Sequence, residues 1–152
     1  MSHRCNTATC WYQPNPKGEG ARIDDLGKLI LRFGIGGILL VHGISKLQNG
    51  IGFVEQMVSA NGLPAFVAYG VYVGEVLAPV LIIAGVFTRP AALVIAFDLL
   101  GAVFMARRAD IGKITGGGAW AIEVEALFIL GALAIACFGA GRLALGRPGG
   151  YN

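Results

Sequence analysis

The sequence predicts an all-α integral membrane protein, a four-helix bundle with a short amphipathic helix between its first and second spans. Of its 152 residues, 55% are hydrophobic and only 14% are charged, whereas a soluble domain carries about 25% charged residues. The mean hydropathy is +0.67, and four apolar segments alternate with polar connections. Helices are predicted because strand alternation is absent from the sequence and lipid offers no hydrogen-bond partner to an open sheet edge.

A polar tail, residues 1–25, precedes the first apolar segment. It contains His3, Cys5 and Cys10 together with prolines and charges, and it lacks the apolar core of a secretory signal. Two thiols and one histidine are too few to hold a metal without another chain, and a reducing cytoplasm disfavours a disulfide between the thiols. We therefore predict a cytoplasmic tail and no metal site.

The membrane domain is expected over residues 26–145, with a short C-terminal tail at 146–152. A hydrocarbon core of about 30 Å requires about 20 helical residues. The apolar segments therefore predict spans at about 26–47, 66–87, 90–106 and 119–141. The third is the shortest, and Pro90 suits its first turn.

Two connections have patterns of their own. In residues 49–64 the apolar side chains recur at helical spacing, at Phe53, Val54, Met57 and Val58. This spacing predicts a short amphipathic helix on the membrane surface, which ends near Gly62 because glycine permits a left-handed cap. Residues 111–118 end in three glycines and predict a flexible link.

Lysine and arginine residues near the span ends predict the orientation. An inside N-terminus leaves four basic residues outside, Lys46, Arg107, Arg108 and Lys113, and places the larger number on the cytoplasmic side. We predict that both termini are cytoplasmic, although Arg107 and Arg108 favour the opposite arrangement. The net charge of +3 is small and dispersed and predicts no nucleic-acid partner.

Ionisable residues inside the predicted spans are the candidate functional groups, because charges in lipid are costly and usually functional. Glu75 and Asp98 lie near the middle of their spans, and the outer half holds His42, Lys46, Glu123 and Glu125. Charged groups from all four helices therefore reach one zone, which predicts a polar cavity open to the outside.

Spacing within this zone suggests which groups share a face. His42 and Lys46 are four residues apart and lie on one side of a helix, whereas Glu123 and Glu125 are two apart, so only one of them is expected to face inward. A histidine and a carboxylate in a dry pocket suit proton uptake beside a quinone, or binding of a small polar ligand.

A purely structural role is the alternative for each of these groups. Buried Glu75 and Lys46 could simply pair to hold helices together, and for Asp98 a structural or interfacial role is the favoured interpretation. Arg32 and Arg89 lie near span ends, where long side chains extend to lipid phosphate, so we expect them to act as anchors. Small residues in the first two spans predict close helix contact.

Several cofactor signatures are missing from the sequence. It contains no phosphate loop, dinucleotide fingerprint, CxxCH haem site or nucleophile elbow. His42 is the only histidine in the predicted spans, so paired histidine ligands for a membrane haem are not available. The sequence therefore predicts neither haem nor dinucleotide binding.

An ordered set of short motifs resembles the DoxX family of membrane proteins. An arginine (Arg32) opens the first span, and HGISKL follows at residues 42–47. The later motifs are GLP at 62–64, GEVLAP at 74–79, GVFTR at 85–89 and FGAGRL at 138–143. The resemblance covers about residues 29–145, and the set is more specific than any one motif.

The resemblance implies a four-helix fold in the cytoplasmic (inner) membrane of a bacterium or archaeon. Some members are associated with quinone-linked oxidation of thiosulfate, and others are membrane partners of redox or stress-response enzymes. The residues that match the family's polar positions are Arg32, His42, Lys46, Glu75, Arg89 and one acid of the fourth segment.

The leading hypothesis is a membrane subunit of a quinone-linked oxidoreductase system, whose own enzymatic activity the sequence leaves open. The predicted catalytic residues are His42, Lys46 and Glu75, and the predicted cofactor-binding set adds Asp98, Glu123 and Arg89. The expected cofactor is a quinone, and the expected partners are lipid and either another subunit or further copies of this chain. A non-catalytic scaffold and a small-solute transporter remain alternatives.

Overall fold

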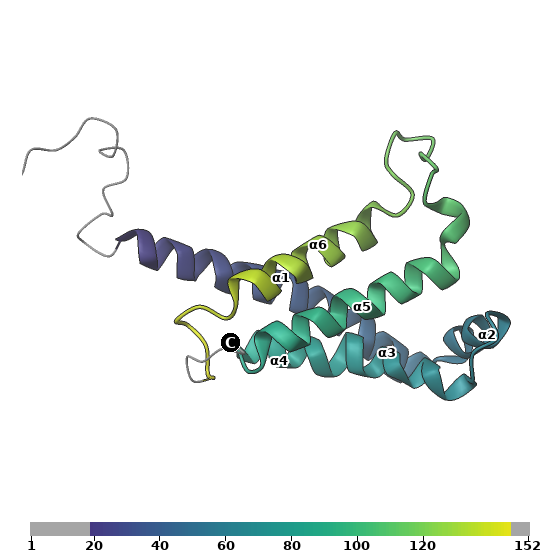
Figure 1. Ribbon diagram of the computed structural model, residues 1–152, viewed down its shortest axis with the longest axis horizontal. Helices are drawn as coiled ribbons and strands as arrows, with labels where there is room; N and C mark the ends of the chain where they lie inside the picture. Colours follow the sequence, from purple (N-terminus) through teal and green to yellow (C-terminus); the bar gives the residue numbers. More distant parts are fainter. Residues whose placement is uncertain (1–18, 147–152) are drawn as a thin grey trace, which may run out of the picture.

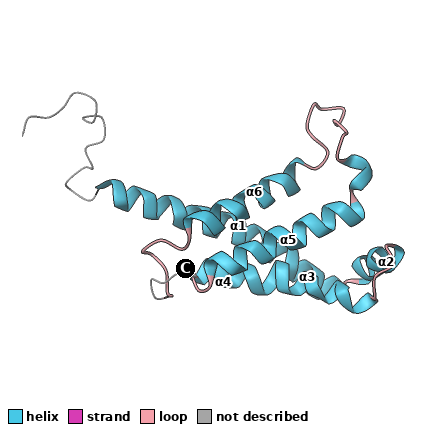
Figure 2. Cartoon of the chain, viewed as in Figure 1, coloured by secondary structure: helices cyan, strands magenta, loops and turns pink. Residues whose placement is uncertain are grey.

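The structure, a computed structural model, describes residues 19–146. Within that range the chain is helical apart from turns and one isolated bridge between Ile114 and Trp120 (Figures 1 and 2). The helices are α1 (Glu19–Asn49), α2 (Gly52–Ala60), η1 (Ala65–Tyr69), α3 (Gly70–Tyr72), η2 (Val73–Leu77), α4 (Ala78–Ala84), α5 (Thr88–Ala106), η3 (Arg108–Asp110) and α6 (Glu123–Phe138).

Three stretches are long and apolar enough to cross a membrane: Arg22–Asn49, Ala65–Ala84 and Thr88–Ala106. They run alongside one another, and α6 packs against α5 and α1 (Figure 1). With 16 residues, α6 is shorter than the run of about 20 that a typical bilayer requires. The all-helical membrane fold is confirmed, and the count of four spans stays a prediction.

The inner face of α1 follows a heptad pattern, in which every third or fourth residue faces the other helices. Four of its members are buried and Lys46 is half-buried; the members are Arg32, Gly36, Leu39, Gly43 and Lys46. The glycines let the next span approach closely. A methyl group at Gly43 would collide with the backbone carbonyl of Glu75, and one at Gly36 would lie 2.8 Å from Ile83.

The second span, predicted over about residues 66–87, is a continuous helix from Ala65 to Ala84 whose geometry changes along its length. A 3₁₀ segment (η1) leads into α3, a π-helical turn (η2) and then α4. Pro79 lies in the first turn of α4. Because a proline ring clashes with the carbonyl four residues earlier and offers it no N–H, Pro79 explains why the turn around Glu75 is widened.

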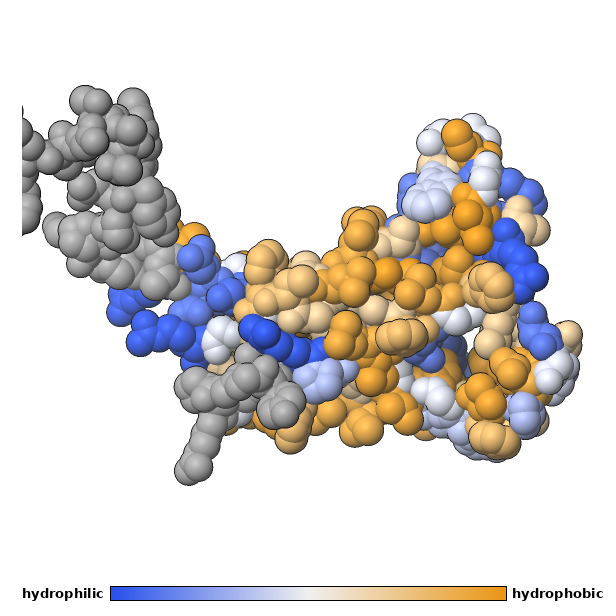
Figure 3. All heavy atoms as spheres, in the orientation of Figure 1, coloured by the Kyte–Doolittle hydropathy of each residue, from blue (hydrophilic) through white to orange (hydrophobic). Residues whose placement is uncertain are grey.

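The core contains two groups of buried apolar residues. The larger joins α1, α4, α5 and α6 through residues such as Leu39, Ile82, Ile95 and Ile135, and the smaller lies beneath α2 around Val58 and Val71. Outward-facing side chains are also apolar, among them Phe97 at 77% exposure. On the face drawn in Figure 3, hydrophobic residues occupy the middle and hydrophilic residues lie toward the two ends, as expected for a lipid-facing surface.

Several predicted boundaries differ from the structure. The first helix begins at Glu19, so residues 19–25 extend it and are not part of a tail. The last begins at Glu123 and not near residue 119. The amphipathic helix is present as α2, and Gly62 takes the expected left-handed conformation with φ +77°.

The link predicted to be flexible at residues 111–118 is an organised turn. Trp120 Nε1 donates a 2.7 Å hydrogen bond to the carbonyl of Ile111, and Thr115 N donates one of 2.8 Å to Ala119 O.

Candidate ligand cavity and its ionisable groups

A cavity of about 570 Å³ lies between the end of α1, α2, the second span and α5. Except for three ionisable side chains, its lining is apolar. The apolar lining residues are Val54, Met57, Val58, Val67, Ala68, Gly70, Val71, Val73, Leu93, Val94, Phe97, Gly101, Ala102 and Met105. Leu93, Val94 and Phe97 are also exposed on the outer surface of α5, so this wall of the cavity adjoins the lipid-facing side of the bundle.

The three ionisable groups are Lys46, Glu75 and Asp98, each from a different span. Lys46 Nζ donates a hydrogen bond to Glu75 Oε1 and forms an ion pair with it. Glu75 is only 6% exposed, and its second oxygen, Oε2, is buried without a hydrogen-bond partner among the described residues. That oxygen remains available to a ligand, a proton or a water molecule.

Asp98 approaches Glu75 through Gly74. A methyl group at Gly74 would collide with the side chain of Asp98, so the carboxylate rests directly against the backbone beside Glu75. This contact requires glycine for space and not for backbone conformation. The π-helical turn that carries Gly74 and Glu75 belongs to a class of helix distortion frequent at functional sites.

The charge of this cluster depends on one proton. Two carboxylates and one ammonium leave a net charge of −1, and one added proton makes the cluster neutral. Since net charge in an apolar surrounding is costly, a proton or a positively polarised ligand group would stabilise the cluster. Such a cluster can donate a hydrogen bond from Lys46 and either accept or release a proton at a carboxyl group.

The structure does not bring the other predicted site residues to this cavity. His42 is exposed on α1, because residue 43 and not residue 42 lies on the buried heptad stripe. Glu123 is exposed at the start of α6, and Arg89 is exposed at the start of α5. None of the three lines the cavity. The prediction that one fourth-segment acid faces inward applies to Glu125, which is half-buried.

Glu125 belongs to a separate ion-pair network at the end of α5. Arg107 Nη1 donates a 2.9 Å hydrogen bond to Glu125 Oε1, and Nη2 donates one to Ala121 O. Arg107 Nε also lies 3.8 Å from Asp110 Oδ2. Lys113 Nζ donates a 2.9 Å hydrogen bond to Asp110. This hydrogen bond, followed by the positive charges of Lys113 and Arg107, lowers the pKa of the half-exposed Asp110.

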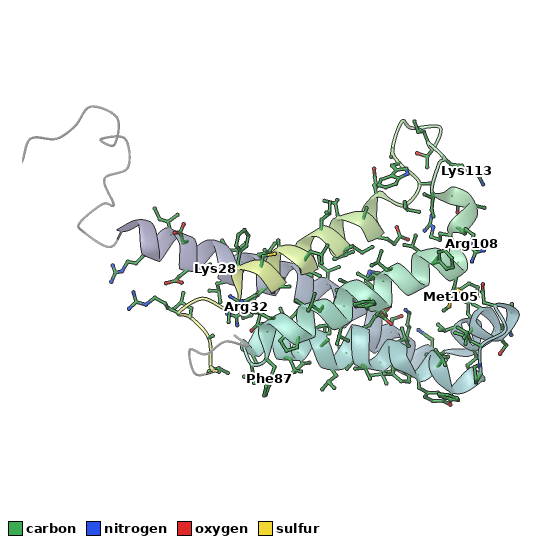
Figure 4. The ribbon with its side chains drawn as sticks, in the orientation of Figure 1. Lys28, Arg32, Phe87, Met105, Arg108 and Lys113 are labelled. Atoms are coloured by element: carbon green, nitrogen blue, oxygen red, sulfur yellow. The ribbon has the colours of Figure 1, made fainter. Side chains whose placement is uncertain are left out.

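Arg32 corrects the expectation of a lipid anchor. Its side chain is 1% exposed and does not extend to the surface. Nε donates to Ile82 O at 2.8 Å, Nη2 to Ile83 O at 2.7 Å, and Nη1 to two carbonyls after α6, at 2.7 and 3.1 Å. Arg32 therefore ties α1 to the end of α4 and to the C-terminal segment. Figure 4 shows it at the end of the bundle where Phe87 lies, opposite Met105 and Arg108.

Metal binding has no candidate here: no group of three or more His, Cys, Asp or Glu side chains within residues 19–146 could hold an ion. The predicted absence of a metal site in the tail stays a prediction, because His3, Cys5 and Cys10 lie outside the described residues.

Sequence reasoning missed Met57 and Met105 as cavity walls, and it missed the contact between Gly74 and Asp98. The heptad spacing from Arg32 to Lys46 could have separated Lys46 from His42.

Comparison with known proteins agrees with the motifs. A family model described as DoxX matches residues 27–108. A protein of Bacillus subtilis (strain 168) described as "Putative oxidoreductase CatD" is 38% identical over 79 residues, which cover 52% of this chain and 58% of that relative. The chain thus matches less than two thirds of the relative's length. No solved structure matches the chain. Because the family match covers more than half of the sequence and includes Arg32, Lys46 and Glu75, the chain belongs to the DoxX family.

Proposed function

We propose that this protein is a membrane subunit of a quinone-linked oxidoreductase system and that its cavity binds the quinone head group. The observation that carries the proposal is the meeting of Lys46, Glu75 and Asp98 in an otherwise apolar cavity, with Glu75 Oε2 buried and unpartnered among the described residues. The relative described as an oxidoreductase supports the reaction class.

The cavity has the properties that a lipid-soluble ligand requires. Its volume of about 570 Å³ falls within the usual range for small-molecule sites, which combine apolar walls with a few convergent polar groups. The wall formed by Leu93, Val94 and Phe97 adjoins lipid, so a ligand could enter from the bilayer without crossing water. A quinone supplies the capacity to take up two electrons and two protons, and its electrons would come from a partner redox protein.

The three ionisable side chains have different roles in this proposal. Lys46 is held by Glu75 and presents further N–H donors toward the cavity, which suits a carbonyl oxygen of the ligand. Asp98 and the free oxygen of Glu75 can hold the one proton that neutralises the cluster and transfer it to the bound ligand. His42, Glu123 and Arg89 have no role in this site, so the proposed functional set is Lys46, Glu75 and Asp98.

The test is binding of a short-chain quinone, ubiquinone-1 or a menaquinone analogue, to the full chain in lipid nanodiscs. Glu75→Gln and Asp98→Asn remove a charge with little change of shape and are expected to weaken binding about tenfold or to change its pH dependence. His42→Ala and Glu123→Gln are the controls and should bind as the wild type does. The thermal unfolding temperature of each variant separates lost binding from lost folding.

Unchanged quinone binding in both Glu75→Gln and Asp98→Asn would contradict the proposal. If those variants only lower the unfolding temperature, the pair of Lys46 and Glu75 holds helices together and the chain is a scaffold. Uptake of a polar solute into liposomes that carry the protein alone would instead favour transport. Co-purification of a flavin, haem or metal protein in fixed stoichiometry supports the subunit role when quinone binding is also present.

A further inference from the structure

A groove of about 790 Å³ lies at the other end of the bundle from the ligand cavity, between α1, α4 and the C-terminal segment. Its residues are Leu29, Arg32, Phe33, Leu40, Val80, Ile83, Ala84, Arg142, Leu143, Ala144 and Leu145. Phe33, Val80 and Leu143 are exposed, so the groove opens on the apolar outer surface.

The groove combines this apolar surface with two positive charges and no carboxylate in its lining. Arg32 donates hydrogen bonds to four backbone carbonyls and has no carboxylate partner among residues 19–146. Arg142 is exposed, and its guanidinium has no ion pair within residues 19–146. Asp25 is nearby, but it accepts its 3.0 Å hydrogen bond from the backbone N–H of Arg142 and not from the guanidinium.

The basic end of the groove lies at the depth where lipid head groups are expected. α5 has 19 residues and is therefore about 28 Å long at about 1.5 Å per residue, close to the thickness of a hydrocarbon core. It begins at Thr88, immediately after the turn at the end of α4. Two of the four carbonyl partners of Arg32, those of Ile82 and Ile83, belong to that same end of α4, so Arg32 and Arg142 lie near the boundary of the hydrocarbon.

We propose that this groove binds a phospholipid with an anionic head group. The phosphate would pair with the Arg142 guanidinium in the field of the buried Arg32, and an acyl chain would lie along Phe33, Val80 and Ile83. Basic pockets between transmembrane helices are the usual sites for anionic lipids. An apolar groove without charge would favour acyl chains alone, and the two arginines add the preference for a negative head group.

The test compares phosphatidylglycerol with phosphatidylcholine of identical acyl chains, using native mass spectrometry of the purified full chain. The wild type should retain phosphatidylglycerol about fivefold better, as expected for one arginine near an anionic head group. Arg142→Gln should abolish most of that preference and Arg142→Lys should restore it. Arg89→Gln, which removes an exposed arginine at the same end but outside the groove, should leave it unchanged.

A second pair of variants tests the acyl-chain path. Val80→Trp fills the groove and should lower retention of both lipids, whereas Leu100→Trp places the same bulk on an exposed position of α5 outside the groove and should not. Equal retention of the two lipids, or an equal effect of Arg89→Gln, would overturn the proposal. Displacement by inorganic phosphate would identify a free-phosphate site, and loss of a dimer in Val80→Trp would identify a contact between copies; either result also overturns it.

Discussion

Arg32 shows how one side chain can satisfy several backbone groups at helix ends. The last carbonyls of a helix have no partner within the helix, and in lipid each such group is costly. The guanidinium of Arg32 donates hydrogen bonds to the carbonyls of Ile82 and Ile83 at the end of α4 and to two further carbonyls after α6. Its charge also lies at the negative end of the α4 dipole, which favours a cation there.

Replacing Arg32 with methionine should destabilise the fold by about 3 kcal/mol or more, because hydrogen bonds to a charged group are each worth about 1.5–3 kcal/mol. Arg32→Lys should recover only part of the loss, since an ammonium has three donors and no planar fork. The thermal unfolding temperature in detergent measures both effects, with the exposed Arg89→Met as the control. An unfolding temperature of Arg32→Met equal to that of the control would contradict this role.

At the scale of the elements, the approach of α1 to the π-helical turn determines where the ionisable groups meet. Pro79 widens the turn that carries Glu75, and Gly43 of α1 leaves room for the carbonyl of Glu75. Three residues further along α1, Lys46 reaches the carboxylate of the same residue. The ion pair therefore depends on a close backbone contact that contains no charge.

Gly43→Ala should separate α1 from the π-helical turn and cost about 1–3 kcal/mol, the usual effect of overpacking. Gly37→Ala is the matched control, because it lies on the same helix and an added methyl group there meets nothing within 4 Å. The control should be neutral or stabilising by up to about 1 kcal/mol, since alanine is the better helix former. Chemical denaturation of both variants measures the difference, and similar values would show that the contact tolerates a side chain.

The elements differ in how well the sequence predicted them. The lengths of the apolar segments, and the glycines and prolines between them, predicted the main helices. The spacing of apolar residues within 49–64 predicted α2. The sequence did not predict the π-helical turn, because Pro79 is compatible both with a helix start and with a distortion. The four-residue spacing between His42 and Lys46 predicted that both belong to the site. Such spacing shows that two residues lie on similar sides of a helix, but not whether each of them faces the interior of the bundle. The partners of Arg32 were not predictable because they are distant carbonyls, which any residue type provides.

At the scale of the whole molecule, an apolar middle lies between two more polar ends (Figure 3), and the two ends hold different features. One end holds α2 and the turn stabilised by Trp120 and Arg107, next to the cavity lined by Lys46, Glu75 and Asp98. The other holds Arg32, the turn before α5 and the groove with Arg142. α6 connects these ends in the fold, although its 16 residues would need a thinned bilayer or flanking residues to cross fully.

Cysteine labelling tests this topology in a background in which Cys5, Cys10 and Cys137 are replaced with serine. A membrane-impermeant maleimide should label Ser59→Cys and Gly116→Cys from one side, and Arg89→Cys and Arg142→Cys from the other. With the predicted cytoplasmic termini, the first pair reacts in intact cells and the second only after permeabilisation. Labelling of Arg142→Cys together with Gly116→Cys would show that α6 does not cross.

The bonds of Arg32 also impose an order on biosynthesis. Its partners in α4 are 50 and 51 residues away in sequence, and those after α6 are 108 and 111 residues away. During synthesis from the N-terminus, α1 therefore emerges with a charge whose acceptors do not yet exist. Until they do, the guanidinium must stay near water. The final seating of α1 can follow only after the last helix and the segment beyond it have been made, so a chain truncated before Ala140 would retain an incompletely assembled first span.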